Sequence, residues 1–186
     1  MKTPVLETDR LILRPITLDD APAIQKYFNN WNIIKNLSMS APWPYPDDGA
    51  ESFIRDNVLP AVEKGDSIVW VITIKDHGDE AVGVLDYRAD GRKEGNRGFW
   101  LAEPFWRRGY MTEAVTAMQD YIFLELGIEK MIVINVHTNE GSRRVKQKSG
   151  AKFIGIKEIE HRGGESKTEV WEITRESWAN FRESDS

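Results

Sequence analysis

The spacing of apolar and polar residues predicts alternating strands and helices in the first half of the chain. Residues 10–16, RLILRPI, alternate apolar and polar side chains as a half-buried strand does. Thr17 can cap a helix over residues 18–28, and a second helix is expected over residues 48–63. The segment between them, residues 31–46, ends in APWPYP, and its prolines predict an irregular stretch without helix or regular strand.

The second half of the chain continues this order. A hairpin is expected from residues 67–74 and 81–87, because the KDHGDE between them is rich in turn residues. Residues 131–136, MIVINV, form the continuous apolar run of a strand that is buried on both faces. The other expected elements are strands at 97–102, 152–159 and 168–174, the last two paired, and helices at 112–126, 140–148 and from 175. This order predicts one α+β domain over residues 1–186, with a twisted sheet and helices on both faces.

Composition narrows the class of protein. The 186 residues suit one core, and the formal charge of −5 disfavours a nucleic-acid partner. No apolar run approaches the roughly 20 residues that span a bilayer, and the N-terminus lacks the apolar core of a signal peptide. The absence of cysteine excludes disulfides and a cysteine nucleophile. We therefore expect a cytoplasmic protein with no metal site and no membrane contact.

Residues 97–115, RGFWLAEPFWRRGYMTEAV, carry the clearest chemical signal. They predict a strand, a tight turn at Arg107 to Gly109, and a helix whose first N–H groups are unpaired. Such a helix end attracts phosphate, and the arginines and the hydroxyl of Thr112 would add to that attraction. An ordinary strand-to-helix turn with solvated arginines is an equally good reading of this segment alone.

A second segment, residues 135–155, strengthens the phosphate reading. It predicts a strand, a break at Asn139, a short helix, a stop at Gly150 and another strand. Together the two segments resemble the GNAT acetyltransferase superfamily, and they are most similar to its RimJ/RimL-like branch, which acetylates the N-termini of ribosomal proteins. The residues that carry the resemblance are Gly98-Phe99-Trp100-Leu101, Trp106-Arg107-Arg108-Gly109-Tyr110-Met111 and Asn139-Glu140-Gly141-Ser142; Trp106 and Met111 depart from the common pattern.

The resemblance implies a GNAT fold with a mostly antiparallel sheet in which two neighbouring strands splay apart. It implies that acetyl-CoA is the co-substrate and that its pantetheine arm pairs with the main chain near Leu101. Asn139 would contact that arm, although a simple helix cap is an equal alternative. The residues expected to hold the pyrophosphate are Arg107, Arg108, Gly109, Tyr110, Met111 and Thr112.

The resemblance also implies catalytic roles. Ser142 would lie near the sulfur of CoA and give a proton to the departing thiolate. Many members of the superfamily use a tyrosine at the position of Lys146 for this step. A general base is harder to find, because the branch often has a carboxylate where this chain has Asn96; Glu94 is our candidate, with Glu103 and Asp86 as further ones. His137 near the end of a strand has a smaller claim to a catalytic role.

The acceptor is expected to be an amine that contacts Trp43, Tyr45 and Trp100. An α-amino group has a pKa of about 7.7–8.0, against about 10.4 for lysine, so a site without a strong base favours an N-terminus of a protein or peptide. A small-molecule amine remains open, as do a non-catalytic acyl-CoA sensor, an RNA-binding module that uses FWRRGY, and a homodimer.

Overall fold

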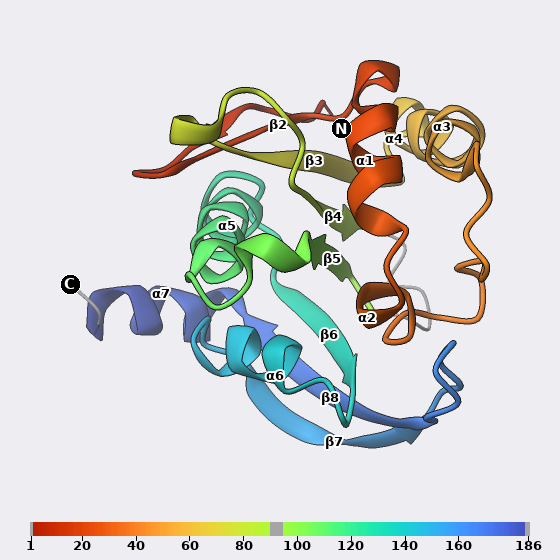
Figure 1. Cartoon of the computed structure of the whole chain (residues 1–186). Helices are drawn as coiled ribbons and strands as arrows, with labels where there is room; N and C mark the ends of the chain where they lie inside the picture. Colours follow the sequence, from red (N-terminus) through yellow and green to blue (C-terminus); the bar gives the residue numbers. More distant parts are fainter. Residues whose placement is uncertain (1, 90–94, 185–186) are drawn as a thin grey trace.

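The computed structural model describes residues 2–89 and 95–184, and its strands form two hydrogen-bonded sheets (Figure 1). A five-stranded antiparallel sheet has the order β1-β2-β3-β4-β5, and a three-stranded antiparallel sheet has the order β6-β8-β7. The strands are β1 (Leu6–Glu7), β2 (Leu11–Pro15), β3 (Ser67–Ile74), β4 (Gly83–Arg88), β5 (Arg97–Leu101), β6 (Lys130–Val136), β7 (Lys152–Glu158) and β8 (Lys167–Thr174).

Both predicted strand pairings are confirmed. Strand β3 pairs with β4, and β7 pairs with β8 across a register shift at Gly155. Sequence patterning missed β1, because two residues are too few to show a period. Its pairing with β2 adds an edge to the larger sheet.

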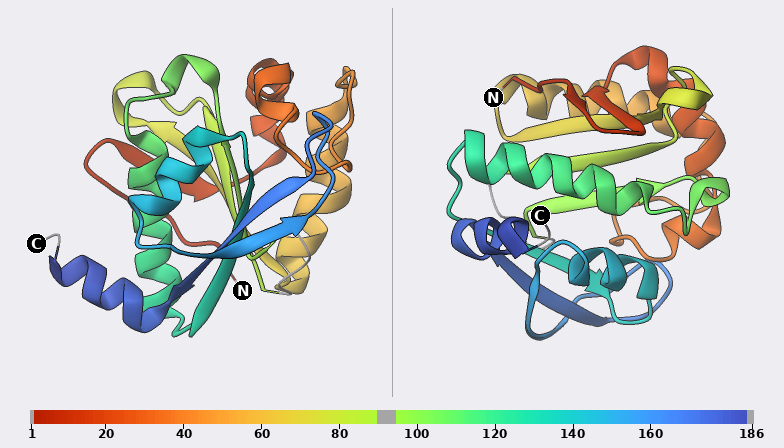
Figure 2. Two further views of the ribbon diagram at one scale, coloured as in Figure 1. Left: turned by 90° about the horizontal axis from the view of Figure 1, so that it is seen from below. Right: turned by 90° about the vertical axis from the view of Figure 1, so that its left-hand side faces the viewer.

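Helices cover both faces of the larger sheet, as the sequence predicts (Figures 1 and 2). Every residue of β3 is buried, and its side chains divide with period two. Trp70 packs in one cluster with helix α5 (Tyr110–Asp120), whereas Val69 and Val71 pack in another with helix α1 (Ala21–Phe28). The remaining α-helices are α2 (Trp31–Ile34), α3 (Gly49–Phe53), α4 (Leu59–Lys64), α6 (Glu140–Gln147) and α7 (Arg175–Ser184).

The predicted helices at 18–28, 48–63 and 112–126 form, with local changes of winding. A 3-10 turn, Leu18–Asp20, opens the first. A π turn at Ile54–Val58 interrupts the second, and a π turn at Tyr121–Glu125 ends the third. Pro60 sits just after the first π turn and has no N–H to donate, so a regular helical ladder cannot pass through it.

The prediction of a wholly irregular segment at 31–46 is wrong at its start. Trp31–Ile34 forms helix α2, because the side chain of Asn30 accepts the N–H of Asn32 and caps it. Ile33 and Ile34 are buried and fix this turn to the rest of the molecule. The prolines lie farther along and bear only on the later part of the segment.

The two sheets meet where β5 and β6 begin to part. Asn96 donates its main-chain N–H to the carbonyl of Ile132 and accepts the Ile132 N–H on its side-chain oxygen, at 2.7 and 2.8 Å. Its side-chain amide also donates to the carbonyl of Arg88. We call these hydrogen bonds of Asn96 the Asn96 clasp. Beyond it no strand ladder joins β5 to β6 within the described residues, which is the predicted splay.

None of the helices in the described parts of the chain is both long and apolar enough to cross a bilayer.

Candidate active site

Strand β5 presents an open edge to β6. Ala102 donates its N–H to Val82, and Arg88 donates to Asn96, which fixes the alternation of hydrogen-bonded pairs along the β4–β5 ladder. By that alternation, the main-chain groups of Phe99 and Leu101 point away from β4 and towards the splay. An extended substrate can therefore hydrogen-bond to this edge as an added strand would.

The turn after β5 is tight and leads directly into a helix, as expected for residues 107–109. Arg107 and Gly109 have positive φ angles of 62° and 81°, and Gly109 is the N-cap of α5. Among residues 2–89 and 95–184, no side chain caps the first turn of α5, so none of these side chains takes up its N–H groups. Trp106 bends back and donates its indole N–H to the Leu101 carbonyl at 2.6 Å, which ties the turn to the end of β5.

Arg10 braces this turn from the neighbouring strand region. Its guanidinium donates to the main-chain carbonyl of Arg108 and lies 4.5 Å from the centre of the Tyr110 ring. Glu113, the acidic residue of the first helical turn, is bound by Arg10 and Thr8. Because its negative charge is paired there, it does not oppose an anion at the helix end.

Helix α6 brings Asn139 and Ser142 together. The side-chain oxygen of Asn139 accepts the N–H of Ser142 at 3.0 Å, so Asn139 is the N-cap that the sequence allowed. One turn farther on, the Nζ atom of Lys146 donates to the hydroxyl oxygen of Ser142 at 2.8 Å. Ser142 and Lys146 are both buried, which the surface character of a helical lysine gives no reason to expect.

A second cation, Arg97 of β5, is buried on the same side of the sheet. Burial lowers the pKa of Arg97 to about 9, and burial together with the charge of Arg97 lowers the pKa of Lys146 well below its ordinary value. Arg97 donates to the side chain of Gln119, which in turn donates to the Ser149 carbonyl. The sequence analysis noted only that Lys146 stands where many members of the superfamily have a tyrosine, and it did not single out Arg97.

His137 belongs to a carboxylate network at the start of α6. Its Nδ1 lies 2.9 Å from Glu169, which also accepts from Arg143 and Asn135. Burial works to raise the pKa of Glu169, but the hydrogen bonds from Arg143, Asn135 and His137 outweigh it and lower that pKa to about 2. Arg143 also donates to the main-chain carbonyl of His137, so this network fixes the end of β6 against α6.

Aromatic side chains line the opposite face of β5. Tyr45 contacts Phe28 edge-on, and Phe28 contacts Trp100, with ring centroids 5.1 and 5.2 Å apart. Burial raises the pKa of Tyr45 to about 12. Of the three residues expected at the acceptor, the structure brings Tyr45 and Trp100 into one aromatic row, whereas Trp43 pairs with Trp31.

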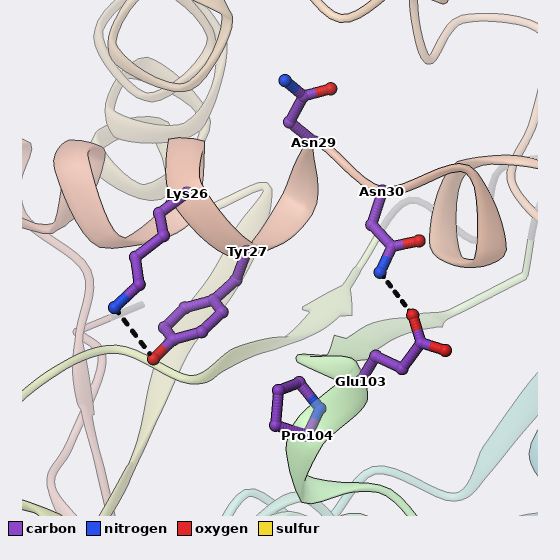
Figure 3. A pocket seen from close by; sticks show the side chains of 6 residues that line it. All are labelled: Lys26, Tyr27, Asn29, Asn30, Glu103 and Pro104. Atoms are coloured by element: carbon purple, nitrogen blue, oxygen red, sulfur yellow. Dashed lines mark hydrogen bonds between the residues drawn. The ribbon is translucent and has the colours of Figure 1, made fainter.

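Two of the three candidate bases, Glu103 and Asp86, are engaged in hydrogen bonds or ion pairs. Glu94 lies outside the described residues. Glu103 accepts hydrogen bonds from Asn30 and Asn32, beside an open hollow of about 380 Å³ (Figure 3). Asp86 forms an ion pair with Arg88 at 3.0 Å.

Asp86 nevertheless lies on the aromatic face of β5. A Cβ atom at Gly98 would come within 2.4 Å of the side-chain oxygen of Asp86, so the carboxylate leans directly over that glycine. No group of three or more metal-ligating side chains occurs in the described ranges.

Known proteins agree with this architecture. The chain matches the family model for the acetyltransferase (GNAT) domain over residues 10–152. It is 30% identical to the uncharacterized N-acetyltransferase YoaA of Bacillus subtilis over 155 residues, which is 82% of this chain and 85% of that protein.

Solved structures show the same fold at lower identity. RimL, a ribosomal L7/L12 α-N-protein acetyltransferase in complex with CoA, superposes with a TM-score of 0.78 at 18% identity, covering 92% of this chain and 98% of RimL. Mycobacterium smegmatis RimJ also gives 0.78 at 18% identity, with 98% and 93% of the two chains covered. The chain belongs to the GNAT acetyltransferase family and is an acetyl-CoA-dependent N-acetyltransferase.

Proposed function

We propose that this chain, as a single GNAT domain, moves the acetyl group of acetyl-CoA directly to the α-amine of a protein or peptide N-terminus. The observation that carries the proposal is the open edge of β5. Helix α5, whose first turn has no side-chain cap among the described residues, follows the end of this strand, and an aromatic row lies on one face of it. These features supply a place for the donor and a separate place for the acceptor. RimL, with the same fold, is named for acetylation of this kind of amine.

On the donor side, the proposal gives each predicted residue a task. The N–H groups from Arg107 to Thr112 bind the pyrophosphate, and the Leu101 N–H on the open edge binds the pantetheine arm. The Leu101 carbonyl is already occupied by Trp106, so only the N–H is available there. Asn139 positions Ser142, which faces the sulfur.

On the acceptor side, Tyr45 and Trp100 line the approach of the amine, and Asp86 attracts its positive charge. Asp86 is already engaged in an ion pair with Arg88. A site whose nearby carboxylate is engaged in this way favours an amine that is already partly neutral at pH 7. Preparing a lysine costs about 3 kcal/mol more than preparing an α-amine. We propose the cytoplasm as the location, in keeping with a chain that has no cysteine.

The test is a panel of acceptors assayed by release of free thiol from acetyl-CoA. Peptides with free N-termini are compared with matched peptides that have a blocked N-terminus and an internal lysine, and with small amines. We expect turnover with free N-termini to exceed turnover with lysine by at least tenfold. Preference for lysine or for a small amine would overturn the choice of acceptor, and binding of acetyl-CoA without any turnover would favour a sensor.

A further inference from the structure

Two buried cations lie on the side of β5 that faces α5 and α6. Arg97 and Lys146 are 4% and 1% exposed, and both approach the ring of Phe99, at 5.8 and 5.6 Å from its centre. Lys146 reaches this place from α6, which packs with the smaller sheet, whereas Arg97 belongs to the larger sheet. The pair therefore spans the splay from both sides.

No carboxylate in the described parts of the chain hydrogen-bonds to either cation. Arg97 donates a hydrogen bond from Nη1 to the side-chain oxygen of Gln119 at 2.5 Å. Its Nη2 atom is buried and has no hydrogen-bond partner among the described residues. Within the same residues, the Nζ atom of Lys146 hydrogen-bonds to the hydroxyl of Ser142 alone. Asp86 and Glu169 act on the two cations only through longer-range charge attraction.

Holding Arg97 and Lys146 in their charged forms at this buried place is costly, which is why burial lowers the pKa of both side chains. The cost falls when a negative charge enters the same space, because each cation then gains an opposite partner in surroundings of low dielectric constant. Ser142 connects the pair to the splay: its hydroxyl oxygen accepts from Lys146, and its hydroxyl hydrogen has no acceptor among the described residues.

We propose that Arg97 and Lys146 form a built-in anion site that stabilises the negative charge developing on the sulfur of CoA as the carbon–sulfur bond breaks, with Ser142 as the contacting group. This inference rests on the proposed function, which puts the acetyl donor in the splay. Ser142 is then the catalytic residue, and Lys146 and Arg97 act through it as positioning residues.

The proton and electron balance of the transfer is complete with these groups. The bond from the acceptor nitrogen to the acetyl carbon forms, and the carbon–sulfur bond breaks with its electron pair on sulfur. Ser142 passes its hydroxyl proton to sulfur and takes one from Lys146, while the acceptor nitrogen loses a proton to solvent. After the thiol leaves, Lys146 regains a proton from solvent.

The experiment titrates the thiol of CoA bound to the full-length protein. The ultraviolet absorbance of the thiolate is followed against pH at saturating protein, with the complex of desulfo-CoA, which lacks the thiol, as the blank. The variants are Lys146→Met and Ser142→Ala, and Lys148→Met is the matched control, since Lys148 is an exposed lysine at the end of the same helix. Replacing a buried lysine by methionine removes a buried charge, so the variant is expected to fold.

We expect the wild-type protein to lower the pKa of the bound thiol by one unit or more, about the effect of an opposite charge at close range. Lys146→Met and Ser142→Ala should each remove most of that shift, whereas Lys148→Met should keep it. An unshifted thiol in the wild type, or the same shift in Lys146→Met, would overturn the inference while leaving acetyl transfer intact. Failure of the wild type to bind desulfo-CoA would instead count against the proposed function itself.

Discussion

Asn96 shows how one side chain can do a different job from the one its position suggests. The resemblance to the RimJ/RimL-like branch implies that a carboxylate often stands at this position, and the amide found here cannot accept the proton of an amine. In the structure, its main-chain N–H and side-chain oxygen both pair with Ile132, and its amide nitrogen pairs with Arg88. Asn96 therefore sets the point from which β5 and β6 diverge.

The first prediction concerns this clasp. Asn96→Ala removes two side-chain hydrogen bonds and should lower the free energy of unfolding by about 1–3 kcal/mol, because the partly buried main-chain groups of Ile132 and Arg88 lose their partners. Asn96→Asp keeps the acceptor for the Ile132 N–H and should lose less. Urea unfolding of the three proteins measures the order, and equal stability of wild type and Asn96→Ala would contradict the clasp.

The second prediction concerns Ser142. Ser142→Ala should lower kcat by about 100-fold or more, the usual contribution of a proton donor, with little change in the KM for acetyl-CoA. Ser184→Ala, an exposed serine in α7, should leave kcat unchanged. Steady-state rates with a peptide acceptor measure kcat for both variants. A Ser142→Ala enzyme with wild-type kcat would show that another group donates the proton.

At the scale of the element, the turn between β5 and α5 both holds the end of the strand and sets the start of the helix. Trp106 anchors the strand end, and Gly109 takes the left-handed conformation that lets α5 begin with free N–H groups. The helix begins at Tyr110, two residues before the predicted start at Thr112. The first turn thus includes Tyr110 and Met111, which the sequence had already assigned to the pyrophosphate.

The third prediction concerns the backbone at Gly109. Gly109→Ala introduces a side chain at φ 81° and should cost about 1 kcal/mol of stability and weaken CoA binding by roughly tenfold. Gly127→Ala is the matched control, since Gly127 also has a positive φ, 66°, but lies at the far end of the same helical stretch. Calorimetry with CoA should find weaker binding only in Gly109→Ala, and equal loss in both variants would reject the turn as the binding site.

At the scale of the whole molecule, one hydrophobic cluster includes side chains of both sheets, and polar contacts join the sheets at the edges of the splay. Asn96 joins them at one end, and Lys146 of α6 reaches Phe99 of β5 across the gap. The network around Glu169 fixes α6 to the smaller sheet and so determines where Lys146 and Ser142 point. Charge pairing remote from the splay therefore supports the geometry within it.

The fourth prediction is a dependence of stability on acid. The pKa of Glu169 is about 2 in the folded protein, whereas the ordinary value for a glutamate in the unfolded chain is 4.5. The folded state therefore favours the charged form of Glu169. The resulting stabilisation, about 3 kcal/mol, is fully present above pH 4.5 and is lost as the pH falls towards 2.

Glu169→Gln should therefore flatten the fall in unfolding free energy over this acid range. Glu140→Gln, at an exposed position in α6, should retain the wild-type slope. Urea unfolding at several pH values between 5 and 2 compares the three proteins. A Glu169→Gln protein with the same acid dependence as wild type would show that another group titrates there.

The sequence by itself determined the order of the elements, their pairing in two hairpins and the turn at Gly109. These features depend on residues close together in the chain, where apolar period, proline and glycine act locally. Only the tertiary structure decided that Lys146 is buried near Arg97 and that Asn96 joins two strands. It also decided that Phe28 contacts both Tyr45 and Trp100. Those roles arise from contacts between residues far apart in sequence, and a lysine or an asparagine carries no local sign of the neighbours that folding will bring to it.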